Sequence, residues 1–217
     1  FKRPGYRMYC DPRMFDGEPD QLYRNNGDGT FTDVSKAAGI ANPAGKGLGL
    51  AVGDIDDDGW PDLYVANDGV RNFLYHNQRD GTFRDIAYSA GVGFDGDGKP
   101  QAGMGTEIAD FDGDGRADIF VTNFSLKAGL ASGLKPLGFG TRLFDFDNDG
   151  DLDIHVTNGH VTDNVHLYHP GLTYAQRDLL YENVGGGRYR DISASAGPAF
   201  ALEHVGRGSA VADLDND

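Results

Sequence analysis

Three stretches of the chain carry carboxylates at a spacing suited to a hard divalent cation. The most acidic stretch runs from Asp145 to Asp153 and reads Asp-Phe-Asp-Asn-Asp-Gly-Asp-Leu-Asp. Counted from its first residue, aspartates occupy positions 1, 3, 5 and 9, and a glycine at position 6 permits a sharp turn. Ions such as Ca²⁺ take many oxygen ligands, so this donor set predicts a calcium-binding loop.

The pattern recurs in register, which separates it from an ordinary Asp-rich turn. Two further copies are complete, and the beginning of a fourth stands at the end of the chain. The carboxylates of the pattern are Asp54, Asp56, Asp58 and Asp62 in the first loop, Asp110, Asp112, Asp114 and Asp118 in the second, Asp145, Asp147, Asp149 and Asp153 in the third, and Asp213, Asp215 and Asp217 in the partial fourth.

The residues that follow each loop argue against an EF-hand. An EF-hand needs a glutamate at position 12 and helices on both sides, whereas position 12 is occupied by Val65, Val121 and Val156. The segments that leave the loops are apolar and partly β-branched, which is typical of strands. We therefore expect each loop to join two β-strands, with position 9 supplying the closing carboxylate.

The elements around the loops repeat as well. A Gly-x-Gly segment precedes each loop, and an asparagine stands thirteen residues after the first aspartate of each complete copy. Glycines in a strand allow neighbouring backbones to approach closely. The glycine pairs are Gly47 and Gly49, Gly103 and Gly105, Gly138 and Gly140, and Gly206 and Gly208; the asparagines are Asn67, Asn123 and Asn158.

Three hairpin patterns complete the repeating unit. Each has a Leu-Tyr-x-Asn strand, a turn of residues typical of hairpins, and a short second arm, as in Leu74–Asn77 with Gly81–Phe83. The other two lie at Leu22–Asn25 with Gly29–Phe31 and at Leu180–Asn183 with Gly187–Tyr189. A unit of four short antiparallel strands, repeated without helical periodicity, predicts an all-β protein with a β-propeller fold, of which this chain holds a part.

The spacing of the loops divides the chain unevenly. The middle unit lacks the Leu-Tyr-x-Asn hairpin after Asn123, and the next unit carries an insert from Val161 to Gln176. Long loops in repeat arrays often serve binding. We expect a trailing half-blade at 1–40, a blade at 46–92, an abbreviated blade at 102–130, a blade at 137–197 and the start of another at 205–217, all within one propeller segment.

The charge of the chain is concentrated in the loops. The formal net charge is −15, and the loops contain half of the 34 acidic residues. Such crowding should destabilise the metal-free form and couple cation binding to folding. An acidic surface of this kind excludes nucleic acid as a partner, and no apolar run is long enough to cross a bilayer.

Other chemistry is weakly represented. The spacing of His155, His160, His166 and His169 fits no zinc pattern, and Cys10 is the single cysteine. Pairs of aspartates could in principle act as acid and base in glycoside hydrolysis. All of them, however, belong to the repeated cation-binding motif. No nucleophile elbow, P-loop or His-Glu-x-x-His motif is present. The sequence favours a non-enzymatic protein.

The combination of these motifs resembles the FG-GAP/VCBS repeats of integrin α-subunit propellers, and more closely the ASPIC/UnbV group of cartilage acidic protein-like proteins. The resemblance extends from Asp20 to Asp217. It implies one Ca²⁺ in each complete loop, held by the aspartates at positions 1, 3, 5 and 9. It also implies a backbone carbonyl ligand at position 7, which is Trp60, Arg116 or Asp151.

We therefore expect a calcium-binding propeller segment outside the cytoplasm: extracellular, at the cell surface or periplasmic. Extracellular calcium modules bind at about 10⁻⁴ to 10⁻³ M. Its loops would present a surface to a protein or glycan partner in adhesion or another interaction. Two alternatives stay open, an accessory scaffold subunit of a larger membrane-associated complex and a non-catalytic domain of a secreted hydrolase.

Overall fold

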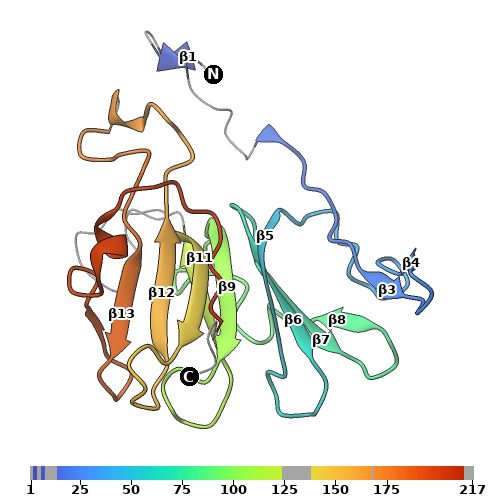
Figure 1. The fold of residues 1–217 in the computed structure, drawn as a ribbon. Helices are drawn as coiled ribbons and strands as arrows, with labels where there is room; N and C mark the ends of the chain where they lie inside the picture. Colours follow the sequence, from blue (N-terminus) through green and yellow to red (C-terminus); the bar gives the residue numbers. More distant parts are fainter. Residues whose placement is uncertain (1, 4–5, 8–13, 124–137, 168, 213–217) are drawn as a thin grey trace.

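The computed structural model describes residues 2–3, 6–7, 14–123, 138–167 and 169–212, and it is an all-β structure (Figure 1). Two short 3-10 helices, η2 (Val165–Leu167) and η3 (Pro198–Ala201), accompany the strands. The strands are β1 (Lys2–Arg3), β2 (Tyr6–Arg7), β3 (Tyr23–Asn25), β4 (Phe31–Asp33), β5 (Gly47–Gly53), β6 (Asp62–Asn67), β7 (Phe73–Asn77), β8 (Phe83–Asp85), β9 (Gly103–Ala109), β10 (Asp118–Asn123), β11 (Gly138–Phe144), β12 (Asp153–Asn158), β13 (Leu179–Asn183) and β14 (Tyr189–Asp191).

The strands form the predicted four-stranded antiparallel blades. Two sheets are complete, with the orders β5-β6-β7-β8 and β11-β12-β13-β14. Strands β9 and β10 form a third, two-stranded sheet between them, and residues 124–137, where the hairpin of this unit was predicted to be missing, lie outside the described residues. Strands β3 and β4 pair as a separate hairpin. The described strands form blades of a propeller and no closed ring.

The first strands of successive blades lie side by side because their glycines have no side chain. A Cβ atom placed on Gly49 of β5 would lie 2.0 Å from the carbonyl oxygen of Met104 in β9. One placed on Gly105 of β9 would lie 2.1 Å from the carbonyl oxygen of Phe139 in β11. The register of β5 and β11 shifts between the two glycines of each Gly-x-Gly, as at a β-bulge. The predicted close approach of neighbouring backbones is confirmed at these positions.

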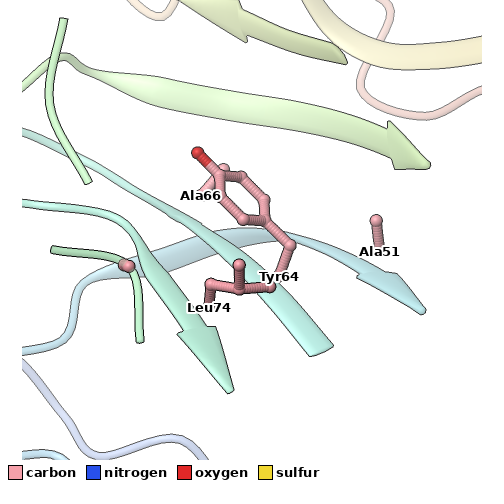
Figure 2. Close-up of a cluster of buried hydrophobic side chains, with 5 residues drawn as sticks. Ala51, Tyr64, Ala66 and Leu74 are labelled. Carbon is pink, nitrogen blue, oxygen red and sulfur yellow. The ribbon is translucent and has the colours of Figure 1, made fainter. Parts of the chain in front are cut away.

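Apolar side chains fill the space between adjacent sheets. Ala51, Tyr64, Ala66 and Leu74 are buried on one face of the first complete blade, as Figure 2 shows, and Ile108 of β9 packs against them. The Tyr64 hydroxyl donates a hydrogen bond to the carbonyl oxygen of Val92 at 3.1 Å, and burial raises its pKa to about 12. The opposite face is covered by the segment around the β3–β4 hairpin, through Leu22 and Ile40.

The insert of the last complete blade follows β12 and projects beyond the ends of the strands (Figure 1). Val165 is fully buried within it, whereas Val161, Leu167 and Tyr174 expose 43%, 47% and 39% of their surface. The amide of Gln176 donates to the carbonyl oxygen of His204 at 2.8 Å, and the reverse bond is 3.0 Å. The insert is therefore anchored at its base and exposes apolar side chains.

None of the helices in the described part of the chain is long and apolar enough to span a membrane.

Candidate metal centre

The three complete Asp-rich loops occupy equivalent places in the fold. The first loop joins β5 to β6, the second joins β9 to β10, and the third joins β11 to β12. Since each loop follows the first strand of its unit, all three lie at the same end of the blades, at the bottom of Figure 1. The insert after β12 lies at the opposite end. These loops are the strand-to-strand connections that the sequence predicts.

The aspartate at position 1 closes the turn of each loop. Its two carboxylate oxygens accept backbone N–H groups from positions 5 and 6. In the first loop Asp58 and Gly59 donate to Asp54 at 3.0 and 2.7 Å, and the third loop has the same bonds to Asp145 at 3.1 and 2.9 Å. The glycine at position 6 has a positive φ in each loop, 85°, 84° and 94° for Gly59, Gly115 and Gly150. This confirms its predicted role in the sharp turn.

Position 4 is a second left-handed residue that the sequence analysis missed. Asp57 has φ 57°, Gly113 has φ 76° and Asn148 has φ 60°. Asp, Gly and Asn are the residue types that enter this region most readily. Their recurrence at position 4 was the available signal.

The aspartate at position 9 is the most buried carboxylate of each complete blade. Asp62 and Asp153 are both 1% exposed. The oxygens of Asp153 accept the N–H of Phe146 at 2.7 Å and the N–H of Asn183, the last residue of β13, at 2.8 Å. Asn77 at the end of β7 donates to Asp62 in the same way at 2.8 Å. The Leu-Tyr-x-Asn motif therefore orients the closing carboxylate of the loop, a role that its use as a hairpin marker did not suggest.

Three of the four predicted carboxylates come together in each loop. Ligand atoms from positions 1, 3 and 9 all lie within 4.8 Å of one another. Position 5 is outside these groups, and its carboxylate instead accepts the N–H of position 7 at 2.8, 2.9 and 2.9 Å in the three loops. The groups are Asp54, Asp56 and Asp62; Asp110, Asp112 and Asp118; and Asp145, Asp147 and Asp153.

Mutual repulsion acts within the second and third loops. Partial burial raises the pKa of Asp118, and the charges of Asp112, Asp114 and Asp110 raise it further. The pKa of Asp147 is raised in the same manner, first by desolvation and then by its acidic neighbours. A cation placed among these groups would relieve the repulsion.

The first loop differs because basic side chains from the β7–β8 hairpin contact it. Arg79 donates to Asp58 Oδ2 through Nη2 at 2.7 Å and through Nε at 3.1 Å. The His76 Nε2 atom lies 2.9 Å from Asp56 Oδ2. Asp56, Asp58 and His76 form another group that could hold a metal ion. The hydrogen bond from Arg79 lowers the pKa of Asp58. This contact joins residues twenty-one positions apart, and no sequence motif predicts it.

Two sets of predicted ligands are not part of the three-carboxylate groups. Asp213, Asp215 and Asp217 lie outside the described residues. The carbonyl groups of Trp60, Arg116 and Asp151 stay predictions as ligands, although all three residues are positioned at the exit of the turn by the hydrogen bonds from their amides.

Among the histidines of the third unit, His155 lies between a serine and an aspartate. The His155 Nδ1 atom lies 2.8 Å from Ser209 Oγ, and its Nε2 atom lies 3.7 Å from Asp178 Oδ2. This Ser-His-Asp arrangement superficially resembles a catalytic triad. Asp178, however, accepts the backbone N–H of Asn158 at 3.0 Å, as Asn72 does for Asn67 at 2.9 Å in the earlier blade. The neutral side chain of Asn72 thus occupies in the earlier blade the position that Asp178 occupies here. This equivalence indicates a structural role for Asp178.

The donor chemistry of the loops fits a calcium ion. Each group offers three carboxylates on a turn fixed by backbone hydrogen bonds, with further oxygen atoms of position 5 and of the backbone nearby. Hard oxygen donors in this number suit Ca²⁺ better than a thiophilic or imidazole-preferring metal. The structure therefore contains several Asp-rich groups that could hold a metal ion.

Comparison with known proteins defines the class. The family model described as FG-GAP-like repeat matches residues 14–65 and 54–121, which include the first two loops. The chain belongs to the FG-GAP repeat proteins, and the resemblance found in its sequence is confirmed.

Relatives of one kind were found among curated proteins. Cartilage acidic protein 1 of Homo sapiens is 37% identical over 112 residues, which are 52% of this chain and 16% of that protein. The proteins of the same name from Mus musculus and Xenopus tropicalis are 36% identical over 112 residues and 39% identical over 95 residues. They cover 52% and 44% of this chain and 17% and 14% of those proteins. The match thus spans about one sixth of the length of these relatives.

Proposed function

We propose that this chain is a calcium-stabilised propeller segment of an extracellular protein that binds another macromolecule through its loops. One observation carries the proposal: the same three-carboxylate group recurs at the same place in three successive units. Membership in the FG-GAP repeat proteins and similarity to proteins named for cartilage support an extracellular interaction domain. The chemistry of the aspartates supports a binding role without catalysis.

The positions of each loop have different roles in binding the ion. Positions 1, 3 and 9 form a preassembled acidic group, and position 5 and the carbonyl group of position 7 complete the ligand set. Calcium would supply positive charge that neutralises the loop and ties the start of the second strand to the end of the first. The buried position-9 aspartate connects this charge to the third strand through the amide of Asn77 or Asn183.

The partner-binding surface is assigned to the insert end of the blades. Val161, Leu167 and Tyr174 are exposed on a segment whose own core residue, Val165, is buried. A loop held from beneath in this way can present apolar anchors with little loss of entropy on binding. We propose a protein or glycan as the partner. The metal loops, at the other end, support the blade.

Thermal unfolding of the whole chain with and without calcium tests the proposal. At a free Ca²⁺ concentration of 100 times Kd, one site adds about 2.7 kcal/mol to the free energy of unfolding. For a chain of this size each kcal/mol raises Tm by about 2–4 °C. We expect a rise of about 5–10 °C for each occupied site, reversed by a chelator. Magnesium should have a smaller effect because it retains its water ligands. A Tm that does not respond to calcium or to a chelator would refute the proposal.

A further inference from the structure

Arg79 engages the position-5 aspartate of the first loop. Its guanidinium group contacts Asp58 Oδ2 with two nitrogens, at 2.7 and 3.1 Å, while Asp58 Oδ1 accepts the amide of Trp60 at 2.8 Å. Both oxygens of Asp58 therefore have partners. The Asp58 side chain is 11% exposed and the Arg79 side chain 56% exposed, so the arginine reaches in from the surface. Arg79 and a calcium ion at the first loop would therefore compete for the carboxylate of Asp58.

Arg79 also occupies a place where the other hairpins have glycine. Its φ is 65°, and the matching residues Gly27 and Gly185 have φ 82° and 78°. The match is defined by the same bond, because each of the three amides donates to the asparagine two residues earlier at 2.8–3.0 Å. An arginine in the left-handed region is unfavourable relative to glycine. The ion pair with Asp58 gives this position a function that glycine could not provide.

The third loop lacks an equivalent of Arg79. Gly185 stands where the first blade has Arg79, so no side chain can reach the loop from that position. In Leu-Tyr-x-Asn, the variable residue is His76 beside the first loop and Glu182 beside the third. Glu182 is paired with Arg190, whose guanidinium donates to its carboxylate at 2.5, 2.7 and 3.1 Å. The first loop thus has a guanidinium group bound to its position-5 aspartate, whereas the matching hairpin residue of the third blade offers no cation to its loop.

We propose that Arg79 is an internal competitor for the first loop, so that this loop binds calcium more weakly than the third. The inference rests on the proposed function, because it assumes that the loops bind calcium. It means that the loops of one propeller fill at different calcium concentrations. The identity of one hairpin residue then sets the affinity of the loop beside it.

The first loop can be observed separately from the others. Trp60, at its position 7, is the single tryptophan of the chain. Terbium(III), which takes oxygen ligands as calcium does, emits when a nearby excited tryptophan transfers energy to it. Selective tryptophan excitation during a Tb³⁺ titration, followed by displacement with Ca²⁺, therefore reports on the first loop. The variants are Arg79→Gln, Arg79→Lys and a charge-matched control, Lys36→Gln, in the turn after β4.

We expect Arg79→Gln to strengthen Tb³⁺ and Ca²⁺ binding at the first loop by roughly threefold to tenfold at low ionic strength, because a positive charge a few ångströms away is removed. Lys36→Gln should leave the affinity unchanged. Arg79→Lys keeps the positive charge but loses the two-nitrogen contact of the guanidinium group, so its affinity should lie between those of Arg79→Gln and Lys36→Gln. Calorimetry with Ca²⁺ on the unmodified chain provides the reference for the sum of all loops.

Each outcome decides one question. An affinity of Arg79→Gln equal to that of Lys36→Gln, with calcium still bound, would refute the competitor role and leave the proposed function standing. Weaker binding in Arg79→Gln would also refute it, since Arg79 would then orient Asp58 for the ion. Absence of both calorimetric heat and terbium emission in the unmodified chain would instead refute calcium binding itself.

Discussion

Gly105→Ala is expected to destabilise the chain by about 3 kcal/mol or more, as overpacking of a well-packed contact typically costs 1–3 kcal/mol and occasionally more. The added Cβ would lie 2.1 Å from the carbonyl oxygen of Phe139 and 3.0 Å from Thr122 Oγ1. The first of these is a backbone atom of the neighbouring blade, so relief requires β9 and β11 to move apart. Urea denaturation should show the loss as a lower midpoint, and Tm should fall by about 6–12 °C.

The matched control is Gly96→Ala. Gly96 has nothing within 4 Å of an added Cβ. Alanine there should leave stability nearly unchanged or raise it by a few tenths of a kcal/mol through the unfolded state. Gly49→Ala, whose Cβ would meet the carbonyl oxygen of Met104 at 2.0 Å, should behave like Gly105→Ala. Equal stability of Gly105→Ala and Gly96→Ala would mean that the first strands do not pack backbone to backbone.

Asp153→Ala is expected to be the most damaging change within the metal loops. The carboxylate is 1% exposed and accepts the amides of Phe146 and Asn183. Alanine leaves the buried amide of Asn183 and the partly buried amide of Phe146 without this partner, and the buried one alone costs about 1–3 kcal/mol. Reduced repulsion within the loop offsets part of this loss in the metal-free chain. We expect a net loss of about 2–4 kcal/mol without calcium, and the loss of one calcium ion from the binding stoichiometry.

Asp151→Ala is the matched control for charge. Asp151 is exposed. Its replacement by alanine removes one negative charge from the same loop but keeps the backbone carbonyl group that is the predicted ligand at position 7. It should change stability by less than about 0.5 kcal/mol, as expected for an exposed position, and retain the calcium ion. If Asp153→Ala were no more harmful than Asp151→Ala in urea denaturation with a chelator present, the bridging role of the position-9 carboxylate would be wrong.

Much of the fold follows from local patterns. The Gly-x-Gly segments, the loops and the asparagines at their fixed distances predicted the first and second strands, and β5, β9 and β11 begin at the first glycine of each pair. The asparagines Asn67, Asn123 and Asn158 end the second strands as predicted. Period and turn chemistry are local properties, so a single sequence carries them.

Two of the missed features depend on residues that are distant in sequence. The amide of Asn183 reaches Asp153 across thirty residues, and Arg79 reaches Asp58 across twenty-one. Such contacts exist only once blades have formed, and no spacing rule along the chain predicts them. The separation of position 5 from positions 1, 3 and 9 has a local cause, because its carboxylate accepts the amide of position 7, two residues further on. Spacing alone placed all four carboxylates in one set. The division into blades, the choice of calcium and the ligand roles stay predictions.

An anomalous difference map from crystals of the whole chain grown with calcium tests the central claim most directly. The account predicts a peak in each of the three complete loops, with carboxylate oxygens of positions 1, 3 and 9 at about 2.3–2.6 Å from it. Anomalous peaks absent from all three loops at saturating calcium, in an otherwise well-defined map, would contradict it.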